Sequence, residues 1–338
     1  MELESETLGA HVLQIANESQ SFNTSFGGKI VEFNASLVRQ GSSAEQAHAV
    51  HKASLSEPSS SKLLGLYELN YPYLWRAVLI EMFATFAMFI VSIGAVLSTF
   101  GRQPGPNIAP LINPPALGIA VIHFFLLTLF IFAFAAHSGG HMNPLISFST
   151  MCTGHMPVAR GTLYIIAQCL GSVLASGLMR AALPEETQRW SENALGQGTL
   201  GGCAAGLGIT GIQLFLIEFA FSLGLLVVAY GVAFDARRGD MFGPFLAPLC
   251  VGAALAIMIF ASGTLAPQSS GAVMNPARCF GPAFVVGDRN WDYQWARWLG
   301  PLGAALVNAA VYWLAPPHHK DLYDESQATK GVNQKLSV

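Results

Sequence analysis

The sequence predicts an all-α membrane protein, with six transmembrane helices and two short re-entrant half-helices arranged as an inverted repeat. Three observations predict this class. The 338 residues are 52% hydrophobic and only 11% charged, whereas soluble domains carry about 25% charged residues. Six continuous apolar stretches are each long enough to cross a bilayer as a helix, which takes about 20 residues. A seven-residue motif, which we call the repeated phrase, also occurs in two similar copies, one in each half of the chain.

Composition and spacing also exclude several kinds of partner. The net charge is only -3 and the lysines and arginines are dispersed, so the chain offers no basic surface for nucleic acid. The five cysteines lack the spacing of a zinc site or a disulfide framework. His137 and His141 have the i, i+4 spacing of a metalloprotease helix, but the glycines between them break a helix and the general-base Glu is missing. We therefore expect no metal, no cofactor and no nucleic-acid partner.

The two ends of the chain read as tails. Residues 1–70 are Ser-rich and polar, and their first acidic residues stand where a signal peptide would need positive charge. We expect a disordered cytosolic tail there, a channel-like domain over 71–316 and a cytosolic C-terminal tail over 317–338. An even number of spans puts both ends on one side of the membrane, although lysines and arginines at the span ends are nearly balanced. We expect a multi-pass protein of the plasma membrane.

Six spans can be marked by continuous hydrophobicity. One copy of the repeated phrase lies between the second and third spans, and the other lies between the fifth and sixth. Each half therefore reads span, span, half-helix, span, with repeat one over about 77–183 and repeat two over about 210–315. Three spans per unit is an odd number, so the second unit is inverted relative to the first. The predicted spans are 77–100, 116–136, 160–183, 210–234, 244–264 and 296–315.

The repeated phrase predicts the start of each half-helix. It reads Ser-Gly-Gly-His-Met-Asn-Pro at 138–144 and Ser-Gly-Ala-Val-Met-Asn-Pro at 270–276. Asn is a favoured N-cap, and Pro is favoured at the first helical position, where its missing N–H costs nothing. The apolar stretches that follow are too short to span a bilayer. We expect half-helices that begin at Asn143 and Asn275 and meet near the midplane.

These features resemble the aquaporin, or major intrinsic protein, family over residues of about 72 to 316. The resemblance rests on the two Asn-Pro turns, on a Glu in the first and fourth spans, and on Arg278 followed by Gly281-Pro282. It implies a homotetramer in the lipid bilayer, with one pore per subunit for water or small uncharged solutes. The pore motifs carried over from the family are Asn143, Pro144, Leu145, Asn275, Pro276 and Ala277.

Three details are similar to one subfamily, the X-intrinsic proteins of plants and fungi. They are Leu145 after the first Asn-Pro, Cys279 directly after Arg278, and the run Leu-Gly-Gly-Cys that ends at Cys203. Because Cys203 is the one cysteine of the long third loop, we expect it to pair with a copy in another subunit. Cys279 reads equally as a packed residue or as a reactive thiol.

The two Asn side chains suggest how such a pore would work. If each Asn oxygen accepts the free N–H groups of its own half-helix, the NH2 group is left to donate into the pore. Two helix N-termini, each worth about +0.5 charge, would face one point and repel cations and protons. The alternatives weighed are an inverted-repeat secondary transporter and an intramembrane hydrolase. We expect a passive channel and no enzyme.

The family resemblance implies a constriction of four residues. Arg278 and Ala272 follow from the motif, and ungapped spacing puts the other two at His123 and Gly263. A salt bridge is the alternative for Arg278, and a packed interior histidine is the alternative for His123. Because Gly263 and Ala272 are small, we expect the opening to pass glycerol and hydrogen peroxide, with urea and boric acid as further candidates.

Two carboxylates inside the spans need a separate interpretation. Glu81 and Glu218 stand at equivalent places in the two repeats. They could relay protons or bind ions, or they could accept hydrogen bonds from the Asn-Pro loops, whose backbone would otherwise be unsatisfied in lipid. We favour the second role, and we expect His141 to support the first loop as well.

Overall fold

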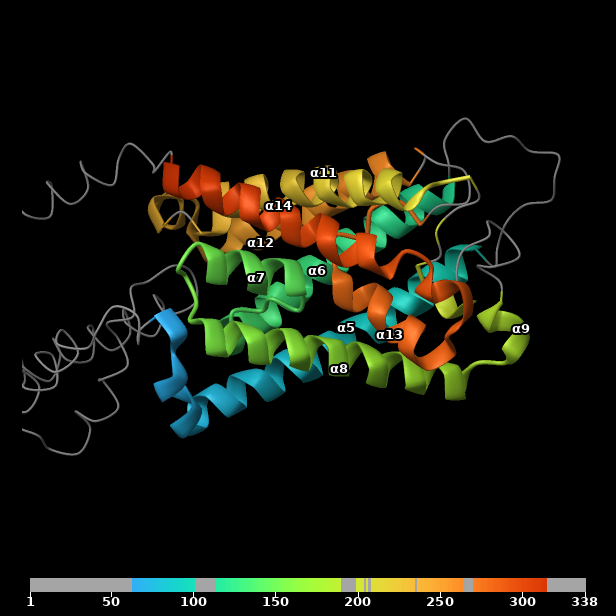
Figure 1. Ribbon diagram of the computed structural model, residues 1–338, viewed down its shortest axis with the longest axis horizontal. Helices are drawn as coiled ribbons and strands as arrows, with labels where there is room; N and C mark the ends of the chain where they lie inside the picture. The colour runs from blue at the N-terminus through green and yellow to red at the C-terminus, as the bar shows by residue number, and fades with distance from the viewer. Residues whose placement is uncertain are drawn as a thin grey trace, which may run out of the picture.

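The computed structural model is a bundle of helices with two short helices at its centre (Figure 1). Its long helices run in the order that the sequence predicts, span, span, half-helix, span, twice over. The predicted tails, over 1–62 and 317–338, lie outside the described residues. The structure describes residues 63–100, 114–189, 199–203, 205, 208–234, 236–263, 265 and 270–314.

Repeat one and repeat two have matching elements. The two half-helices are α7 (Pro144–Cys152) and α13 (Pro276–Val286), which lie end to end across the middle of Figure 1. Short turns complete the chain: η2 (Leu66–Asn70), α9 (Glu185–Gln188), η3 (Thr199–Gly201), η4 (Tyr230–Phe234) and η5 (Asp288–Trp291). The long helices are α5 (Pro72–Phe100), α6 (Pro114–Ser138), α8 (Val158–Ala182), α11 (Gly211–Ala229), α12 (Ala236–Ser262) and α14 (Gln294–Leu314).

Five of these helices are long and apolar enough to cross a membrane, namely those in α5, α6, α8, α11 and α12. The sixth predicted span, α14, has 21 residues but a lower hydropathy than the spans in these five helices. Its polar residues Arg297 and Asn308 are buried, whereas its outer face exposes apolar side chains such as Leu306 and Val311. At 1.5 Å per residue α14 is about 30 Å long, which is the thickness of the hydrocarbon core. Its polar residues lower its mean hydropathy, but they face the protein interior, so the surface that faces the lipid is still apolar.

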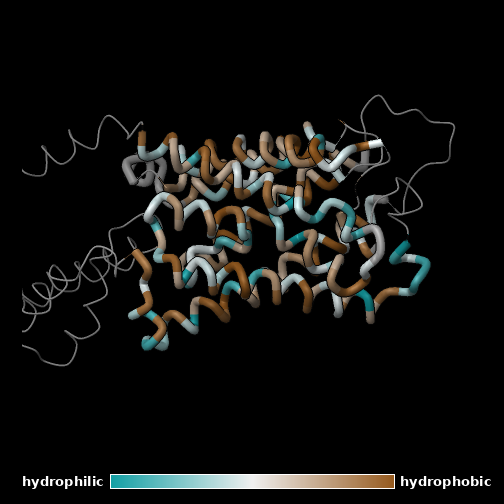
Figure 2. Tube along the Cα trace, in the orientation of Figure 1, coloured by the Kyte–Doolittle hydropathy of each residue, from teal (hydrophilic) through white to brown (hydrophobic). Residues whose placement is uncertain are grey.

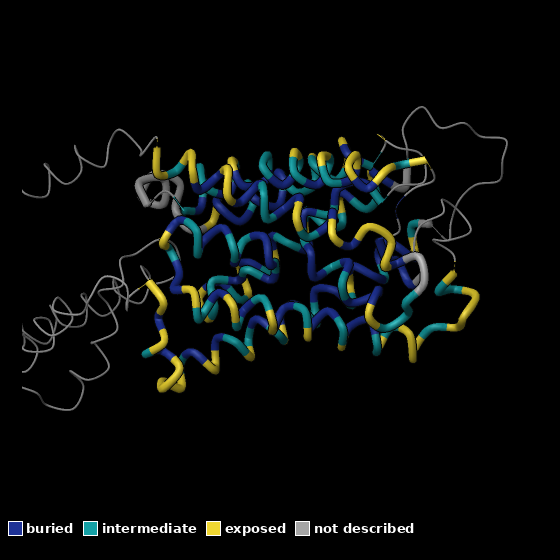
Figure 3. The backbone as a smooth tube through the Cα atoms, viewed as in Figure 1, coloured by how far each residue is buried: buried dark blue, intermediate teal, exposed yellow. Residues whose placement is uncertain are grey.

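The same arrangement holds on α8. Ile166, Leu170, Leu174 and Leu178 follow one another at i, i+4 spacing and are all exposed. The opposite face buries small and polar residues instead, among them Gly171 and Ser172. Large apolar side chains outside and small residues inside are typical of helices packed within a membrane. Figure 2 shows the hydrophobic residues along the helices, and Figure 3 shows the buried residues gathered in the interior.

The repeats pack in equivalent pairs. In the first, α5 packs on α8 and α6, and in the second, α11 packs on α14 and α12. The halves then exchange their short helices, because α13 packs on α8 and α7 packs on α14. Close approach depends on glycine: a Cβ on Gly171 would lie 2.4 Å from Met82 O of α5, and one on Gly300 would lie 2.9 Å from Phe215 O of α11. The half-helices are thus held by the opposite repeat.

The predicted end of the N-terminal tail is wrong. The N-terminal tail was expected to reach residue 70, but Leu66–Asn70 forms a helical turn whose Glu68 binds Arg160 of α8 through two hydrogen bonds of 2.9 Å. An ion pair cannot be found from local composition. The fifth span, expected from about 244, is confirmed as Phe245–Ser262, although the helix α12 that contains it begins earlier, at Ala236. Hydropathy marks the apolar part of a helix and not the polar turns that precede it.

The contact between α8 and α5 can be tested by adding one methyl group. Gly171→Ala should destabilise the protein, by about 1–3 kcal/mol, because the methyl group meets backbone that cannot move aside. The matched control is Gly177→Ala on the same helix, where a Cβ would meet nothing within 4 Å. The measurement is the thermal unfolding temperature of the purified protein in detergent. Equal temperatures for the two variants would contradict this account of the packing.

Candidate functional site

The two half-helices begin at the predicted residues. Asn143 is the N-cap of α7, and its Oδ1 accepts a hydrogen bond from Leu145 N at 2.9 Å. Asn275 is the N-cap of α13, but its buried Oδ1 has no hydrogen-bond partner within the described part of the chain. Proline occupies the first turn of both helices. The expected cap is therefore made in repeat one and not in repeat two.

The Asn amide groups are bonded across the two repeats. Asn143 Nδ2 donates to Met274 O at 2.9 Å, and Asn275 Nδ2 donates to Met142 O at 3.0 Å. The expectation that the whole NH2 group is free is therefore wrong. An amide carries two N–H donors, so each Asn keeps one N–H beyond this crossed bond.

The residue before each Asn has an unusual backbone. Met142 has φ 46° and Met274 has φ 56°, in the left-handed region of backbone conformation that residues other than glycine seldom adopt. Both methionines are fully buried. This conformation turns each carbonyl group toward the Asn of the other repeat, which accounts for the crossed bonds. Backbone strain of this kind persists only where the surroundings enforce it.

Glu81 supplies part of that enforcement in repeat one. It is fully buried and accepts four hydrogen bonds. Two come from backbone N–H groups of the loop, His141 N at 2.9 Å and Met142 N at 2.7 Å. The others come from Ser138 Oγ at 2.7 Å and from Gln168 Nε2 at 2.9 Å. These are the contacts that a brace for unwound backbone in lipid requires.

Glu218 has the equivalent place in repeat two. It accepts hydrogen bonds from Val273 N at 3.1 Å and from Met274 N at 3.0 Å. Glu218 is also bonded to a side chain of a neighbouring helix, Arg297 of α14. Arg297 Nη1 donates to Glu218 Oε1 at 2.9 Å, and both side chains are buried. Arg297 was not among the predicted site residues. An arginine inside an apolar helix was the signal that could have found it.

His141 lies in the first loop, as expected. Its ring Nδ1 is 3.1 Å from Ser147 Oγ, and the edge of the ring faces Tyr164. Tyr164 in turn donates to Ser138 O at 2.8 Å. The first loop is therefore held from both sides, by Glu81 and by this aromatic contact.

One cavity of about 140 Å³ joins these residues. Its lining includes Asn143 and Asn275 from the half-helices, and His123, Ala272 and Arg278 from the predicted constriction. Gly263 is not part of the lining. The wall from α12 is formed instead by apolar residues that include Ile259. The helix ends at Ser262 and Gly263 follows it directly, so the place of Gly263 at the constriction stays a prediction.

His123 satisfies both interpretations that the sequence left open. It lines the cavity, but its ring nitrogens are bonded inside the protein. Nδ1 is 2.8 Å from Ile119 O, and because a carbonyl group can only accept, Nδ1 carries the proton. In the neutral ring Nε2 is then an acceptor, and it receives the hydroxyl of Ser92 at 2.9 Å. The histidine therefore gives the cavity a fixed wall.

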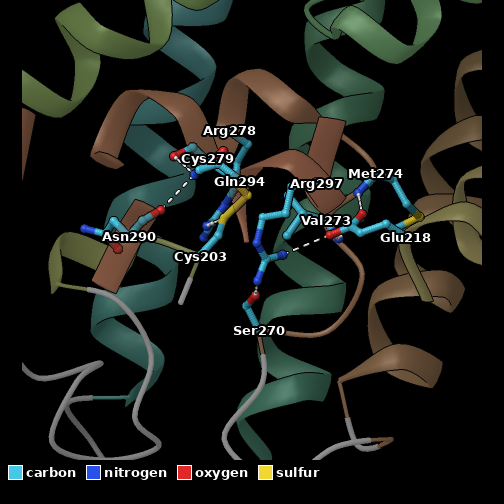
Figure 4. Close-up of a disulfide and its surroundings, with 10 residues drawn as sticks. All are labelled: Cys203, Glu218, Ser270, Val273, Met274, Arg278, Cys279, Asn290, Gln294 and Arg297. Carbon is cyan, nitrogen blue, oxygen red and sulfur yellow. Dashed lines mark hydrogen bonds and ion pairs between the residues drawn. A yellow bond between two sulfur atoms is a disulfide. The ribbon is translucent and has the colours of Figure 1, made fainter. Parts of the chain in front are cut away.

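Arg278 is anchored at the third loop (Figure 4). Its Nη1 donates to Cys203 Sγ at 2.8 Å. Cys203 itself is bonded in a disulfide to Cys279, the residue that follows Arg278 in α13. The expected disulfide between subunits is therefore wrong. The third loop folds back onto a half-helix that carries its own cysteine, which a comparison of cysteines in loops alone cannot show.

A polar cluster closes the other end of α7. Ser149 Oγ donates to Tyr230 Oη at 2.9 Å, and Thr153 Oγ1 lies 2.8 Å from both Tyr230 Oη and His155 Nδ1. Burial lowers the pKa of His155, which lies between the helices. Tyr230 starts the π-helical turn η4, whose Phe234 lines the cavity. The sequence gave no pattern for this cluster, because its members come from three separate segments.

This geometry agrees with a comparison of the sequence with known families. The sequence pattern of the major intrinsic proteins matches residues 68–312. The chain belongs to the major intrinsic protein family. It is therefore an integral, multi-pass membrane protein and a channel for water and small solutes. Among the described residues, no group of three His, Cys, Asp or Glu side chains could hold a metal ion.

Individual major intrinsic proteins show the same relation. A probable aquaporin of the TIP alpha type from Phaseolus vulgaris is 32% identical over 258 residues, which are 75% of this chain and 92% of that protein. Aquaporin TIP1-2 from Zea mays is 29% identical over 72% of this chain and 87% of that protein. The X-ray structure of the aquaglyceroporin from Plasmodium falciparum has a TM-score of 0.53 and 19% identity, and covers 74% of this chain and 99% of that one. The last comparison confirms the predicted fold.

The disulfide can be tested directly. Digestion without reductant should give a linked pair of peptides that contain Cys203 and Cys279 of one chain, identified by mass spectrometry. On a non-reducing gel, disulfide-linked dimers should be absent, because both thiols are used within the subunit. Cys203→Ser should make Cys279 reactive toward a maleimide after denaturation. A dimer band that disappears in Cys203→Ser would contradict the assignment.

Proposed function

We propose that this channel conducts water, glycerol and hydrogen peroxide passively and excludes protons and ions. The observation that carries the proposal is the pair of crossed Asn amides. Asn143 and Asn275 each use one N–H to hold the opposite loop, and both residues line the same cavity, where the second N–H is left to donate. A solute oxygen at the midplane can therefore meet two fixed donors.

The two donors explain why protons are excluded while water passes. Each half-helix adds a positive end worth about +0.5 charge, and both ends point at the same place. A cation there would lose its hydration without gaining a counter-charge. A water molecule bonded to both amides uses its oxygen as an acceptor and cannot pass a proton along a chain of waters. Neutral molecules with an oxygen acceptor keep their path.

The wall around Arg278 supports passage of solutes larger than water. Ala272 contributes a single methyl group, and Ile259 adds an apolar surface. A small polyol can bond to the Arg and the backbone while its CH groups lie on this apolar side. Urea and boric acid remain further candidates.

The carboxylates argue against the alternative, a secondary transporter. Coupling to protons or ions would need a carboxylate that is free to bind them. Glu81 and Glu218 instead accept hydrogen bonds from the two loops. A hydrolase is also disfavoured, since Ser138 Oγ donates to Glu81 and Ser270 Oγ accepts from Arg297. Glu81 already holds the backbone N–H groups of His141 and Met142, and Ser270 is bonded to a cation and not to a base, so we infer that the protein is not an enzyme.

We also infer a homotetramer in the plasma membrane with both termini in the cytosol. The start of α5 and the end of α14 lie at one end of the bundle in Figure 1, opposite to α9 and α13. The disulfide between Cys203 and Cys279 supports this orientation, because disulfides persist on the oxidising side of a membrane. The same two cysteines, after Arg278 and in the third loop, support membership of the X-intrinsic subfamily.

The donor pair is tested by Asn275→Asp. A carboxylate accepts and cannot donate when ionised, so water and glycerol flux should fall by about tenfold and some cation leak should appear. The measurement is stopped-flow swelling of proteoliposomes, with ion current recorded in planar bilayers. Asn143→Asp is the matched variant in the other repeat and should act in the same direction. Normal flux and intact ion exclusion in both variants would rule out the central donor site.

The solute path is tested by enlarging the wall. Ile259→Trp should reduce glycerol flux more than water flux, by about threefold in the ratio, because glycerol needs the wider opening. Gly263→His should change the ratio less, since Gly263 lies outside the lining. Both are measured by stopped-flow swelling. A larger effect at Gly263 than at Ile259 would support the position expected from the sequence.

A further inference from the structure

Arg297 is a buried cation next to the second half-helix, and it does not line the cavity. Its side chain is 1% exposed. Nη1 donates to Glu218 Oε1 at 2.9 Å and Nη2 donates to Ser270 Oγ at 2.8 Å, as Figure 4 shows. The guanidinium group therefore joins the carboxylate to the first residue of the repeated phrase in this half.

In the first repeat, the carboxylate that holds the Asn-Pro loop is bonded to a neutral side chain and not to a cation. There the helical partner of the carboxylate is Gln168, which is also buried and which donates to Glu81 at 2.9 Å. The backbone contacts are equivalent, since Glu81 holds Met142 N and Glu218 holds Met274 N. A neutral amide is thus sufficient to brace such a loop. The positive charge of Arg297 needs another explanation.

The difference between the two half-helices is Arg278. Helix α13 carries this arginine, whereas α7 carries no charged residue. A carboxylate buried in a medium of low dielectric strongly attracts a nearby cation. Glu218 binds the residues four and five positions before Arg278, so it is the counter-ion that Arg278 would otherwise take. In the structure Arg297 forms the ion pair with Glu218, and Arg278 instead donates to Cys203 Sγ and lines the cavity.

We propose that Arg297 is a positioning residue for solute selection: by occupying Glu218 it keeps the guanidinium group of Arg278 at the wall of the pore. Arg297 neutralises the carboxylate, and its second bond to Ser270 fixes the loop that leads to Ala272 and Asn275. Loss of the charge at 297 would let Arg278 turn toward Glu218 and away from the cavity. The opening would widen on that side. This inference rests on the proposed role of Arg278 at the constriction.

The test compares solute selection in four variants by stopped-flow swelling of proteoliposomes. Arg297→Gln copies the brace of the first repeat and leaves Glu218 without a cation, so the ratio of glycerol to water permeability should rise by about threefold. The double variant E218Q/R297Q removes the charge that attracts Arg278, and its ratio should return to the wild-type value. Arg297→Lys keeps a positive charge and should stay within about twofold of wild type. Arg160→Gln breaks the ion pair with Glu68, which is not part of the cavity, and should leave the ratio unchanged.

A merely structural role for Arg297 predicts a different pattern. Water and glycerol flux would then fall together in Arg297→Gln, and the double variant would not restore the ratio; either result would overturn the proposal. If Arg297→Gln does not fold, judged by gel filtration, the other variants still decide. A raised ratio in Arg297→Lys or in E218Q/R297Q would then contradict the role of the charge.

The proposed function can fail separately. Arg278→Val should raise the ratio of glycerol to water permeability in any account that places Arg278 at the constriction. An unchanged ratio in Arg278→Val would reject that placement, whatever Arg297 does. A raised ratio in Arg278→Val with no change in Arg297→Gln would reject only the further inference.

Discussion

The fold depends on the contact between two Asn-Pro turns at its centre. Each Asn amide is bonded to the carbonyl group of the methionine that precedes the other Asn. Because each bond joins one repeat to the other, the two half-helices are fixed relative to each other and their N-termini face the same point. The left-handed backbone at Met142 and Met274 costs about 1–3 kcal/mol for each residue. It is tolerated because both polar groups of each methionine are held, the N–H by a Glu and the carbonyl by an Asn.

The bilayer explains why these contacts are so complete. Unwound backbone in a membrane has no water to satisfy it, and the two buried carboxylates supply the missing acceptors. The helices around them bury small residues and expose large apolar ones, which lets the short helices enter the bundle. The repeats nevertheless differ in charge, because Gln168 faces Glu81 and Arg297 faces Glu218. This difference accompanies a second one, since α13 carries Arg278 and α7 carries no charged residue.

Much of this arrangement could be predicted from the sequence, because hydropathy and the Asn-Pro phrase are local signals. The order of helices and the start of both half-helices follow directly from them. The crossed bonds could not be predicted, since they join residues 131 and 133 positions apart. The partner of Cys203 was missed because loop folding decides which cysteine comes near. The place of Gly263 at the constriction stays a prediction, because a count of residues does not show which residues of α12 line the cavity.

We propose that each Asn amide divides its two N–H groups between the opposite loop and the pore. The direct test is a cryo-EM map of the protein in lipid that shows ordered waters. We expect a water molecule within about 3 Å of both Asn143 Nδ2 and Asn275 Nδ2, with the bonds to Met274 O and Met142 O retained. Asn side chains turned away from the pore, or amides whose N–H groups both bond to protein, would contradict it.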